Sequence, residues 1–165
     1  MSPTLRFAQL SDLPAIVDIY NVTIPTRQAT ADLEPISIES RQPWFERHNP
    51  ESRPLWVAEI DGVTVGWLSF ETFYGRPAYD TTAEISIYIA PTYQRQGFGQ
   101  WLLKEAIVQG SSLGLKTLLA FIFAHNVPSL SLFERCGFRE WGNLLRVAEL
   151  DGVERDLIIM GRRIV

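Results

Sequence analysis

A strand, a glycine-containing loop and a helix follow one another in the middle of this chain and limit how it can fold. Residues 83–90, AEISIYIA, alternate apolar and polar side chains, as a strand with one face on a core does. Pro91 ends the strand, and YQRQGFGQWLL at 93–103 brings Gly97 and Gly99 just before a helical pattern. This order predicts an α/β fold whose loop can bind an anion at the start of a helix.

The rest of the chain has the patterns of further strands and helices. Asp61-Gly62 and Asp151-Gly152 each predict a two-residue hairpin turn. The further strands are expected at 7–10, 55–60, 63–70, 117–124, 144–150 and 154–160. The helices are expected after a Ser11 N-cap, over 37–48 with an interruption at Pro43, from the glycine loop to Gly110, and between Pro128 and Gly137. We therefore expect one α/β domain over residues 1–165, with a sheet of mixed direction and helices on its faces.

Composition narrows the function classes. A chain of 165 residues with a net charge of -4 is expected to be one domain and not a general nucleic-acid binder. The single cysteine, Cys136, excludes a disulfide framework and a cysteine-based zinc cluster, and no metal is expected. No apolar run approaches the ~20 residues of a membrane helix. The first residues resemble neither a signal peptide nor a transit peptide, so we expect a cytoplasmic protein.

The glycine loop lacks the features of the two commonest phosphate-binding motifs. The dinucleotide fingerprint needs a third glycine where this chain has Leu102, and the P-loop needs a Lys where Gly99 is followed by Gln100. What remains is Gln94-x-x-Gly97-x-Gly99, a loop whose free N–H groups can bind an anion without magnesium, with added charge from Arg95. On the glycines alone, an ordinary strand-to-helix turn is the alternative.

Two motifs together resemble the GNAT acyltransferase superfamily. The first is the glycine loop, and the second is Asn126-x-x-Ser129-x-x-Leu132-Phe133-x-x-x-Gly137-Phe138 after a buried strand. The resemblance implies a mostly antiparallel sheet of about seven strands, in which two central strands splay apart around the pantetheine arm of acetyl-CoA. The cofactor-binding residues that it implies are Ile87, Tyr88, Ile89, Gln94, Arg95, Gln96, Gly97, Phe98, Gly99, Gln100, Asn126, Ser129 and Phe133.

Nearly the whole chain is similar to one branch, the phosphinothricin and methionine-sulfoximine N-acetyltransferases. The matching residues are Tyr20-Asn21, Glu34-Pro35, Arg41-x-x-Trp44-Phe45-x-x-His48, Val57-Ala58-Glu59-x-Asp61-Gly62-x-x-x-Gly66-Trp67 and Arg76-x-x-Tyr79-x-x-Thr82-x-Glu84-x-Ser86-x-Tyr88. The resemblance implies transfer of an acetyl group from acetyl-CoA to the α-amine of a small amino-acid-like acceptor, by direct attack in a ternary complex. It also implies a homodimer.

Glu84 is the predicted catalytic residue, because the resemblance places the family's general base there. An amine arrives as an ammonium ion, and a carboxylate can take its proton directly or through a water. Partial burial would raise the pKa of Glu84 toward a useful value. A solvent-facing glutamate on an alternating strand is the alternative. A backbone N–H near Tyr88 or Ile89 is expected to hold the oxyanion.

Arg76 and Tyr79, with Glu84, are the predicted acceptor-binding residues. They precede the strand in a loop that the resemblance places near the acceptor, where a guanidinium can hold a carboxylate or sulfonyl oxygen. A solvated arginine on a turn is the alternative. Other aromatic and histidine side chains are expected in the core, in a pocket wall or in a structural role: Trp44, Phe45, Trp67 and His125.

Three positions depart from the branch and keep other functions open. Phe133 stands where relatives have His or Tyr and cannot protonate the leaving thiolate. Ala31 replaces an aromatic residue, and the tail at 149–156 lacks a basic-aromatic run. The alternatives are acetylation of another amine, such as a polyamine, an aminoglycoside or a peptide N-terminus, and a non-catalytic acyl-CoA-binding module. The positive charge of Arg76 argues against a polycationic acceptor, and the carboxylate of Glu84 argues against a non-catalytic module.

Overall fold

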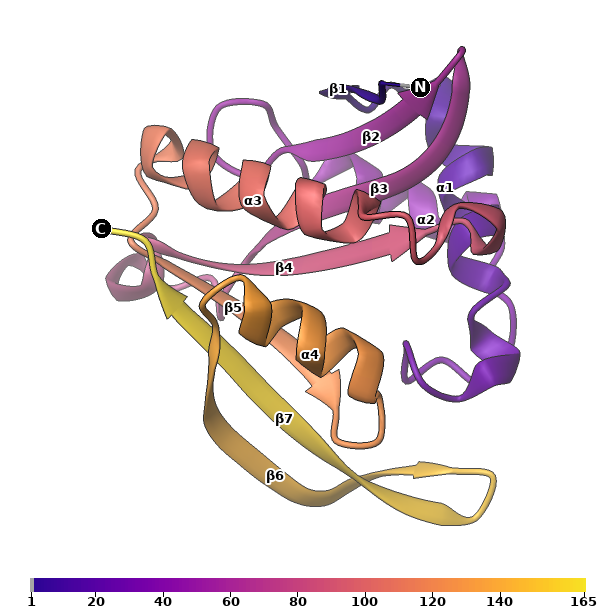
Figure 1. Ribbon diagram of the computed structural model, residues 1–165, viewed down its shortest axis with the longest axis vertical. Coiled ribbons are helices and arrows are strands. Elements are labelled where there is room, and N and C mark those ends of the chain that lie inside the picture. The colour runs from indigo at the N-terminus through magenta and orange to yellow at the C-terminus, as the bar shows by residue number, and fades with distance from the viewer. Residues whose placement is uncertain (1) are drawn as a thin grey trace.

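Seven strands form one sheet in the computed structural model, which describes residues 2–165 (Figure 1). The strands are β1 Thr4–Phe7, β2 Leu55–Ile60, β3 Val63–Thr72, β4 Thr82–Ile89, β5 Thr117–Phe123, β6 Arg139–Leu150 and β7 Val153–Arg163. Their order in the sheet is β1-β2-β3-β4-β5-β7-β6. Only β4 and β5 pair in parallel, and the other neighbours are antiparallel. The expected sheet of about seven mostly antiparallel strands is confirmed.

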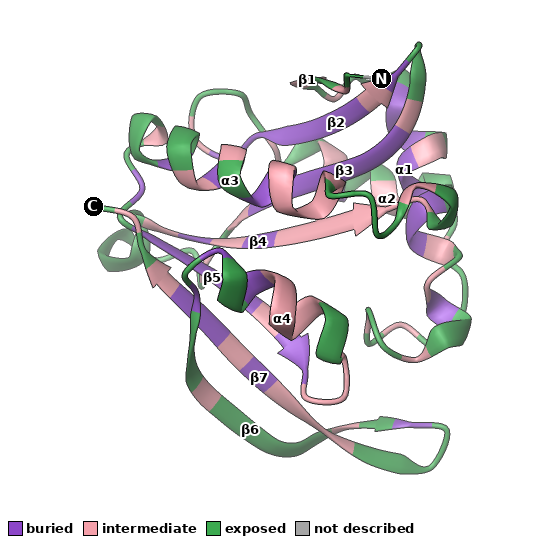
Figure 2. Ribbon diagram, in the orientation of Figure 1, coloured by how far each residue is buried: buried purple, intermediate pink, exposed green. Residues whose placement is uncertain are grey.

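Helices cover both faces of this sheet, and each face has its own core. The helices are α1 Leu13–Asn21, α2 Ile38–Glu46, α3 Phe98–Gly110 and α4 Val127–Arg135. Helices α3 and α4 lie over one face and α1 and α2 over the other (Figure 1). The first core joins α3 and α4 to residues such as Leu68 and Ile85, and the second joins α1 and α2 to Val57 and Trp67. Strands β2 and β5 and the middle of β3 are therefore almost wholly buried, whereas β6 is mostly exposed (Figure 2).

Both aspartate-glycine turns form as predicted. Asp61 and Asp151 have left-handed φ angles of 50° and 53°, and the glycine after each has a φ of 79°. These are the angles of the turn that suits the twist of a hairpin. The second hairpin is longer than expected, because its pairing extends to Arg139 of β6 opposite Gly161 of β7.

Three local expectations near the N-terminus are wrong. The first strand is β1, Thr4–Phe7, and not residues 7–10, because residues 10–12 form a short 3-10 helix. Ser11 lies inside that 3-10 helix and does not cap α1, whose N-cap position is Asp12. Helix α2 continues through Pro43 without interruption. Its Ser37 cap accepts a hydrogen bond from the N–H of Ser40, and burial of Trp44 anchors it.

The parallel pair β4 and β5 separates along its length. Pairing is confined to Thr82 with Thr117, Ala83 with Leu118 and Glu84 with Leu119. Beyond Glu84 both strands continue, to Ile89 and Phe123, without pairing to each other. The predicted splayed central pair is thus present, and Glu84 lies at the narrow end of the opening.

In the part of the chain that the structure describes, no helix has both the length and the apolar character needed to span a membrane. Over the same residues, no three His, Cys, Asp or Glu side chains cluster as metal ligands would.

Candidate active site

A cleft opens where β4 and β5 separate. Its walls are residues 85–88 of β4 and 120–123 of β5, and its ends are closed by Asn126, Ser129 and Phe133 near α4. Gln28 and Ala29, from the loop between α1 and α2, complete the lining. The structure therefore brings the Asn126 motif to the open side of β4, whereas no residue of the glycine loop lines the cleft.

The backbone of β4 presents unpaired groups to this cleft. The N–H of Ala90 donates to the carbonyl of Val65 at 2.8 Å, in register with the pairs that β4 makes with β3. Hydrogen bonds in an antiparallel pair alternate, so even-numbered residues of β4 bond to β3 and odd-numbered residues face β5. The N–H groups of Ile87 and Ile89 therefore point into the opening, whereas that of Tyr88 points to β3. This geometry favours Ile87 or Ile89 as an oxyanion donor over Tyr88.

The loop before α3 can hold a phosphate through its backbone. Within residues 2–165 the N–H groups of 95–100 have no hydrogen-bond acceptor. Gly97 is the N-cap of α3 with a φ of 88°, and Arg95 also has a left-handed φ of 60°. A Cβ at Gly99 would lie 3.2 Å from Leu132, so a side chain there would crowd α4. The free N–H groups and the dipole of a 13-residue helix fit the pyrophosphate of coenzyme A.

Two exposed polar side chains of this loop hydrogen-bond to its own backbone. Gln94 donates to the carbonyl of Ile89 at 3.1 Å, and Gln96 donates to that of Thr92 at 3.0 Å. Phe98 packs on the first core, and Gln100 is half-buried. Among the predicted cofactor residues here, Arg95 alone leaves a charged side chain exposed for the ligand.

Glu84 has the ionisation behaviour of a general base. Burial, and after it the negative charge of Glu71, raise the pKa of its carboxyl group to about 7. Glu71 lies directly opposite on β3, where it accepts a hydrogen bond from the indole of Trp44 at 3.1 Å. A carboxyl group with a pKa near neutrality is half ionised at physiological pH and can exchange protons with an amine.

An aromatic wall extends from Glu71 along the same face of the sheet. Tyr88 stacks on Trp67 with ring centroids 4.7 Å apart, and Tyr20 packs against Tyr88 at 5.2 Å. The Arg41 guanidinium lies 4.4 Å from the ring centre of Trp44. Burial, and after it the hydrogen bond that the hydroxyl donates to Asp32, raise the pKa of Tyr20 to about 12. Burial also raises the pKa of Tyr88, so both phenols of the wall stay protonated at neutral pH.

The predicted acceptor residues Arg76 and Tyr79 lie in the loop that leads into β4. Both are exposed, and in the described chain Arg76 has no ion pair. Tyr79 packs on Phe73 and Tyr74 at 5.6 and 5.8 Å between ring centroids. The structure thus leaves the Arg76 guanidinium available for an anionic group.

Phe133, which also borders the cleft, His125 and Cys136 each contact neighbouring parts of the chain. Phe133 is 4% exposed and packs its edge against Phe138 at 4.9 Å. His125 stacks on Phe123, and its Nε2 lies 2.7 Å from the carbonyl oxygen of Arg27. Burial raises the pKa of the Cys136 thiol, which disfavours a nucleophilic role. Trp44 and Trp67 are buried in the second core, as expected.

Sequence reasoning missed Glu71, Gln28 and Ala29. The register between β3 and β4 sets Glu71 opposite Glu84. The loop at 73–81 that joins these strands is too long for its length to predict which residues pair. Gln28 and Ala29 lie in an irregular segment without periodicity. Glu71 could have been noticed because it is a charged residue in the largely apolar run of β3, where Ser69 is the other interruption.

The chain is similar to known acetyltransferases. Residues 14–138 match the family described as the acetyltransferase (GNAT) family. YwnH of Bacillus subtilis (strain 168), which its name assigns provisionally to the phosphinothricin acetyltransferases, is 54% identical over 162 residues, 98% of this chain and 99% of YwnH. An L-methionine sulfoximine/L-methionine sulfone acetyltransferase of Pseudomonas aeruginosa is 30% identical over 161 residues, 97% of this chain and 94% of that protein.

One of the similar solved structures contains acetyl-CoA. The crystal structure of a phosphinothricin acetyltransferase from Sinorhizobium meliloti in complex with AcCoA has a TM-score of 0.92 at 29% identity, covering 99% of this chain and 89% of that one.

Proposed function

The chain belongs to the GNAT acetyltransferase family and uses acetyl-CoA, and we propose that its acceptor is the α-amine of a small amino-acid-like molecule. The observation that carries the proposal is Glu84, a half-buried carboxyl group with a pKa of about 7 at the narrow end of the cleft. A base in this place can deprotonate an amine beside the inward-facing N–H groups of β4.

Each part of acetyl-CoA has candidate binding groups. We assign the pyrophosphate to the free N–H groups of 95–100, with Arg95 adding positive charge. The amides of the pantetheine arm are assigned to the unpaired backbone of Ile87 and to the cleft residues Asn126 and Ser129. When bound there, acetyl-CoA supplies a thioester carbonyl that an amine can attack.

Glu84 takes a proton from the acceptor's ammonium group, directly or through a water, and so frees the lone pair of the amine. The N–H groups of Ile87 or Ile89 donate to the negative charge that develops on the carbonyl oxygen. Phe133 offers no proton to the cleft. Water therefore protonates the departing sulfur, which is a fair leaving group because an ordinary thiol has a pKa of about 8.5.

Arg76 gives the acceptor its second recognition element. It is exposed and without an ion pair in the described residues, at the loop that leads into the strand of Glu84. A guanidinium binds a carboxylate through two parallel hydrogen bonds. An acceptor with an amine and a carboxylate then uses Glu84 and Arg76 together. Relatives that act on methionine sulfoximine or phosphinothricin, by their names, support this class of acceptor.

The amine class is tested by measuring thiol release from acetyl-CoA across a panel of acceptors. We expect methionine sulfoximine, phosphinothricin or methionine sulfone to give a kcat/KM at least about tenfold above spermidine, kanamycin or a free peptide N-terminus, since one bidentate contact contributes on the order of 1.5–3 kcal/mol. A higher rate with a polycation would show that another amine is the acceptor. Binding of acetyl-CoA without turnover of any amine would identify a non-catalytic module.

We also propose that two copies of this chain pair through β6. This strand is an edge of the sheet and exposes apolar side chains along its length. They are Trp141 at 50%, Leu144 at 41%, Leu145 at 72% and Val147 at 56% exposed. An apolar edge strand invites pairing with another strand, and a second copy covers it symmetrically. The dimer belongs in the cytoplasm, where acetyl-CoA is made and the lone Cys136 stays reduced.

Leu145→Glu is expected to convert the dimer to a monomer, because it places a charge in the covered edge. Size-exclusion chromatography with light scattering measures the mass of each variant at tens of micromolar. Val108→Glu is the matched control, since Val108 is 69% exposed on α3, which covers a face of the sheet and is not part of its edge. A wild-type protein of monomer mass at that concentration would contradict the pairing.

A further inference from the structure

Three consecutive carbonyl oxygens of the loop between α1 and α2 are each held by a side chain from the rim of the cleft. We call residues 27–29 the strap. His125 Nε2 lies 2.7 Å from the first oxygen, Asn126 Nδ2 donates to the second at 3.3 Å, and the Tyr88 hydroxyl donates to the third at 3.0 Å. Tyr88 belongs to β4, whereas His125 and Asn126 follow β5. The strap therefore bridges the two strands where they are no longer paired.

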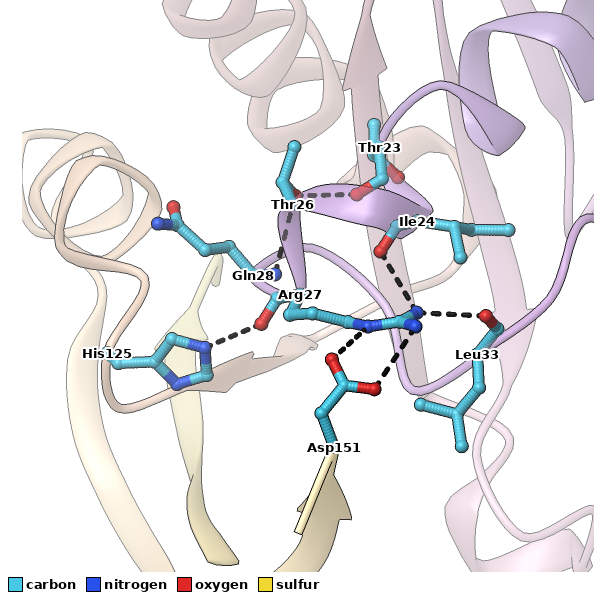
Figure 3. A network of polar contacts seen from close by, with 8 residues as sticks. All are labelled: Thr23, Ile24, Thr26, Arg27, Gln28, Leu33, His125 and Asp151. Atoms are coloured by element: carbon cyan, nitrogen blue, oxygen red, sulfur yellow. Dashed lines mark hydrogen bonds and ion pairs between the residues drawn. The ribbon is translucent and has the colours of Figure 1, made fainter. Parts of the chain in front are cut away.

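The side chain of Arg27 fixes the strap from the other side. Its Nη1 donates to the carbonyl oxygens of Leu33 at 2.9 Å and Ile24 at 3.3 Å. Its Nε and Nη2 donate to the two carboxylate oxygens of Asp151 at 2.8 and 3.3 Å (Figure 3). The guanidinium thus joins both ends of the loop to a single carboxylate in a bidentate pair.

Asp151 belongs to a distant part of the chain. It is the first residue of the turn between β6 and β7, with Gly152 after it. The β6–β7 hairpin projects beyond the rest of the sheet, and its turn reaches back to the strap through this ion pair (Figures 1 and 3). Arg27 itself has a left-handed φ of 56°, a backbone conformation that the surrounding contacts must hold in place.

We propose that the Arg27–Asp151 ion pair positions the strap as a wall of the acceptor site, so that Asp151 sets acceptor affinity without touching the acceptor. The inference rests on the function proposed above. Gln28 and Ala29 border the cleft assigned to the pantetheine arm, and the strap also borders the aromatic wall on the face of Glu84. The Ala29 carbonyl accepts the hydrogen bond of Tyr88, and the chain continues to Asp32, which accepts that of the Tyr20 hydroxyl. Loss of the ion pair removes the contact between the strap and the β6–β7 turn, and leaves the strap held by the side chains at the rim of the cleft.

Asp151→Asn tests this role without breaking the hairpin. Asn-Gly suits a two-residue hairpin turn as well as Asp-Gly does, so the substitution removes the charge and keeps the turn. We expect the KM of the acceptor to rise by about threefold to fivefold, as for loss of one partly exposed ion pair. The value of kcat is expected to stay within about twofold, and so is the Kd of acetyl-CoA, because the strap's carbonyls are still held from the cleft side.

Glu154→Gln is the matched control on the same hairpin. It removes the Arg146–Glu154 pair, which is 3.9 Å long and does not reach the strap. This variant is expected to keep the wild-type acceptor KM. Added salt should raise the acceptor KM of the wild type and of Glu154→Gln, and should affect Asp151→Asn less.

Hydrogen exchange separates this proposal from the function on which it rests, because it needs no acceptor. Amides of residues 27–33 are expected to exchange faster in Asp151→Asn and at the wild-type rate in Glu154→Gln. Unchanged exchange in Asp151→Asn, or an unchanged acceptor KM together with faster exchange, would overturn the positioning role. Failure of every amine as an acceptor, with faster exchange present, would instead count against the proposed function.

Discussion

Glu84→Gln is expected to lower kcat/KM for the amine acceptor by about 10²- to 10⁴-fold, the usual contribution of a general base. Glutamine keeps the size and the hydrogen-bonding oxygen of the side chain but cannot take a proton. The affinity for acetyl-CoA should not change, because the groups assigned to the cofactor lie further along β4 and in the loop at 95–100. Steady-state kinetics and calorimetric titration of CoA measure the two quantities. A variant with more than about a tenth of the wild-type kcat/KM at neutral pH would contradict the assignment.

The pH dependence of the wild type should report the same group. Burial and the charge of Glu71 raise the pKa of Glu84 to about 7, so the base is protonated and inactive below that pH. We expect kcat/KM to rise with pH through an inflection near 7. This inflection should be absent from the residual activity of Glu84→Gln, and it should move to lower pH in Glu71→Gln, which removes the like charge.

The raised pKa of Glu84 also lowers the stability of the wild type at neutral and higher pH. Glu84→Gln avoids this loss. A carboxyl group whose folded pKa lies above its unfolded value binds more protons when folded, so stability falls as pH rises from about 4.5 toward about 7. Between about pH 4.5 and about pH 8 we expect the free energy of unfolding of Glu84→Gln to rise by roughly 1–3 kcal/mol relative to that of the wild type. The range allows for screening by solvent, because Glu84 is partly exposed. Urea unfolding at both pH values measures the rise. Glu51→Gln, at an exposed turn, is the control and should show no such gain.

The sequence predicted the parts of the site that depend on local rules. Alternation over 83–90, the Asp61-Gly62 turn and the glycines before α3 each have a short-range physical cause, and all three appear where expected. The position of β1 was missed because it depends on antiparallel pairing with β2, about 50 residues away, where Arg6 also pairs with Glu59. The strap was missed for the same reason. Its conformation depends on side chains that lie about 60 to 120 residues away in the chain.

The opposition of Glu71 and Glu84 shows where sequence reasoning ends. Each residue reads as a polar side chain on a strand, and only the register between β3 and β4 makes them neighbours. A two-residue turn would have fixed that register, whereas the loop over 73–81 leaves it open. The pKa that suits Glu84 for catalysis therefore follows from tertiary structure, although the residue itself could be named from its motif.

Gly97→Val is expected to weaken binding of CoA by about tenfold or more, since it disturbs the backbone that presents the free N–H groups. Gly97 has a φ of 88°, and a Cβ there would meet no atom within 4 Å. The substitution thus causes no collision, and its cost is the left-handed backbone, about 1–2 kcal/mol. The chain relieves that strain by turning the peptides on either side of residue 97, which redirects N–H groups of the 95–100 set away from the phosphate.

Gly114→Val separates the loss of stability from the loss of binding. Gly114 has a φ of 79° and equally open surroundings, but it follows the C-terminal end of α3, about 20 Å from the cofactor loop along a helix of 13 residues. Both variants should lose similar free energy of unfolding in urea, and only Gly97→Val should lose CoA affinity by calorimetry. Equal CoA affinity in the two variants would mean that the loop at 95–100 does not hold the pyrophosphate. The effect of Gly97→Val would then be strain alone.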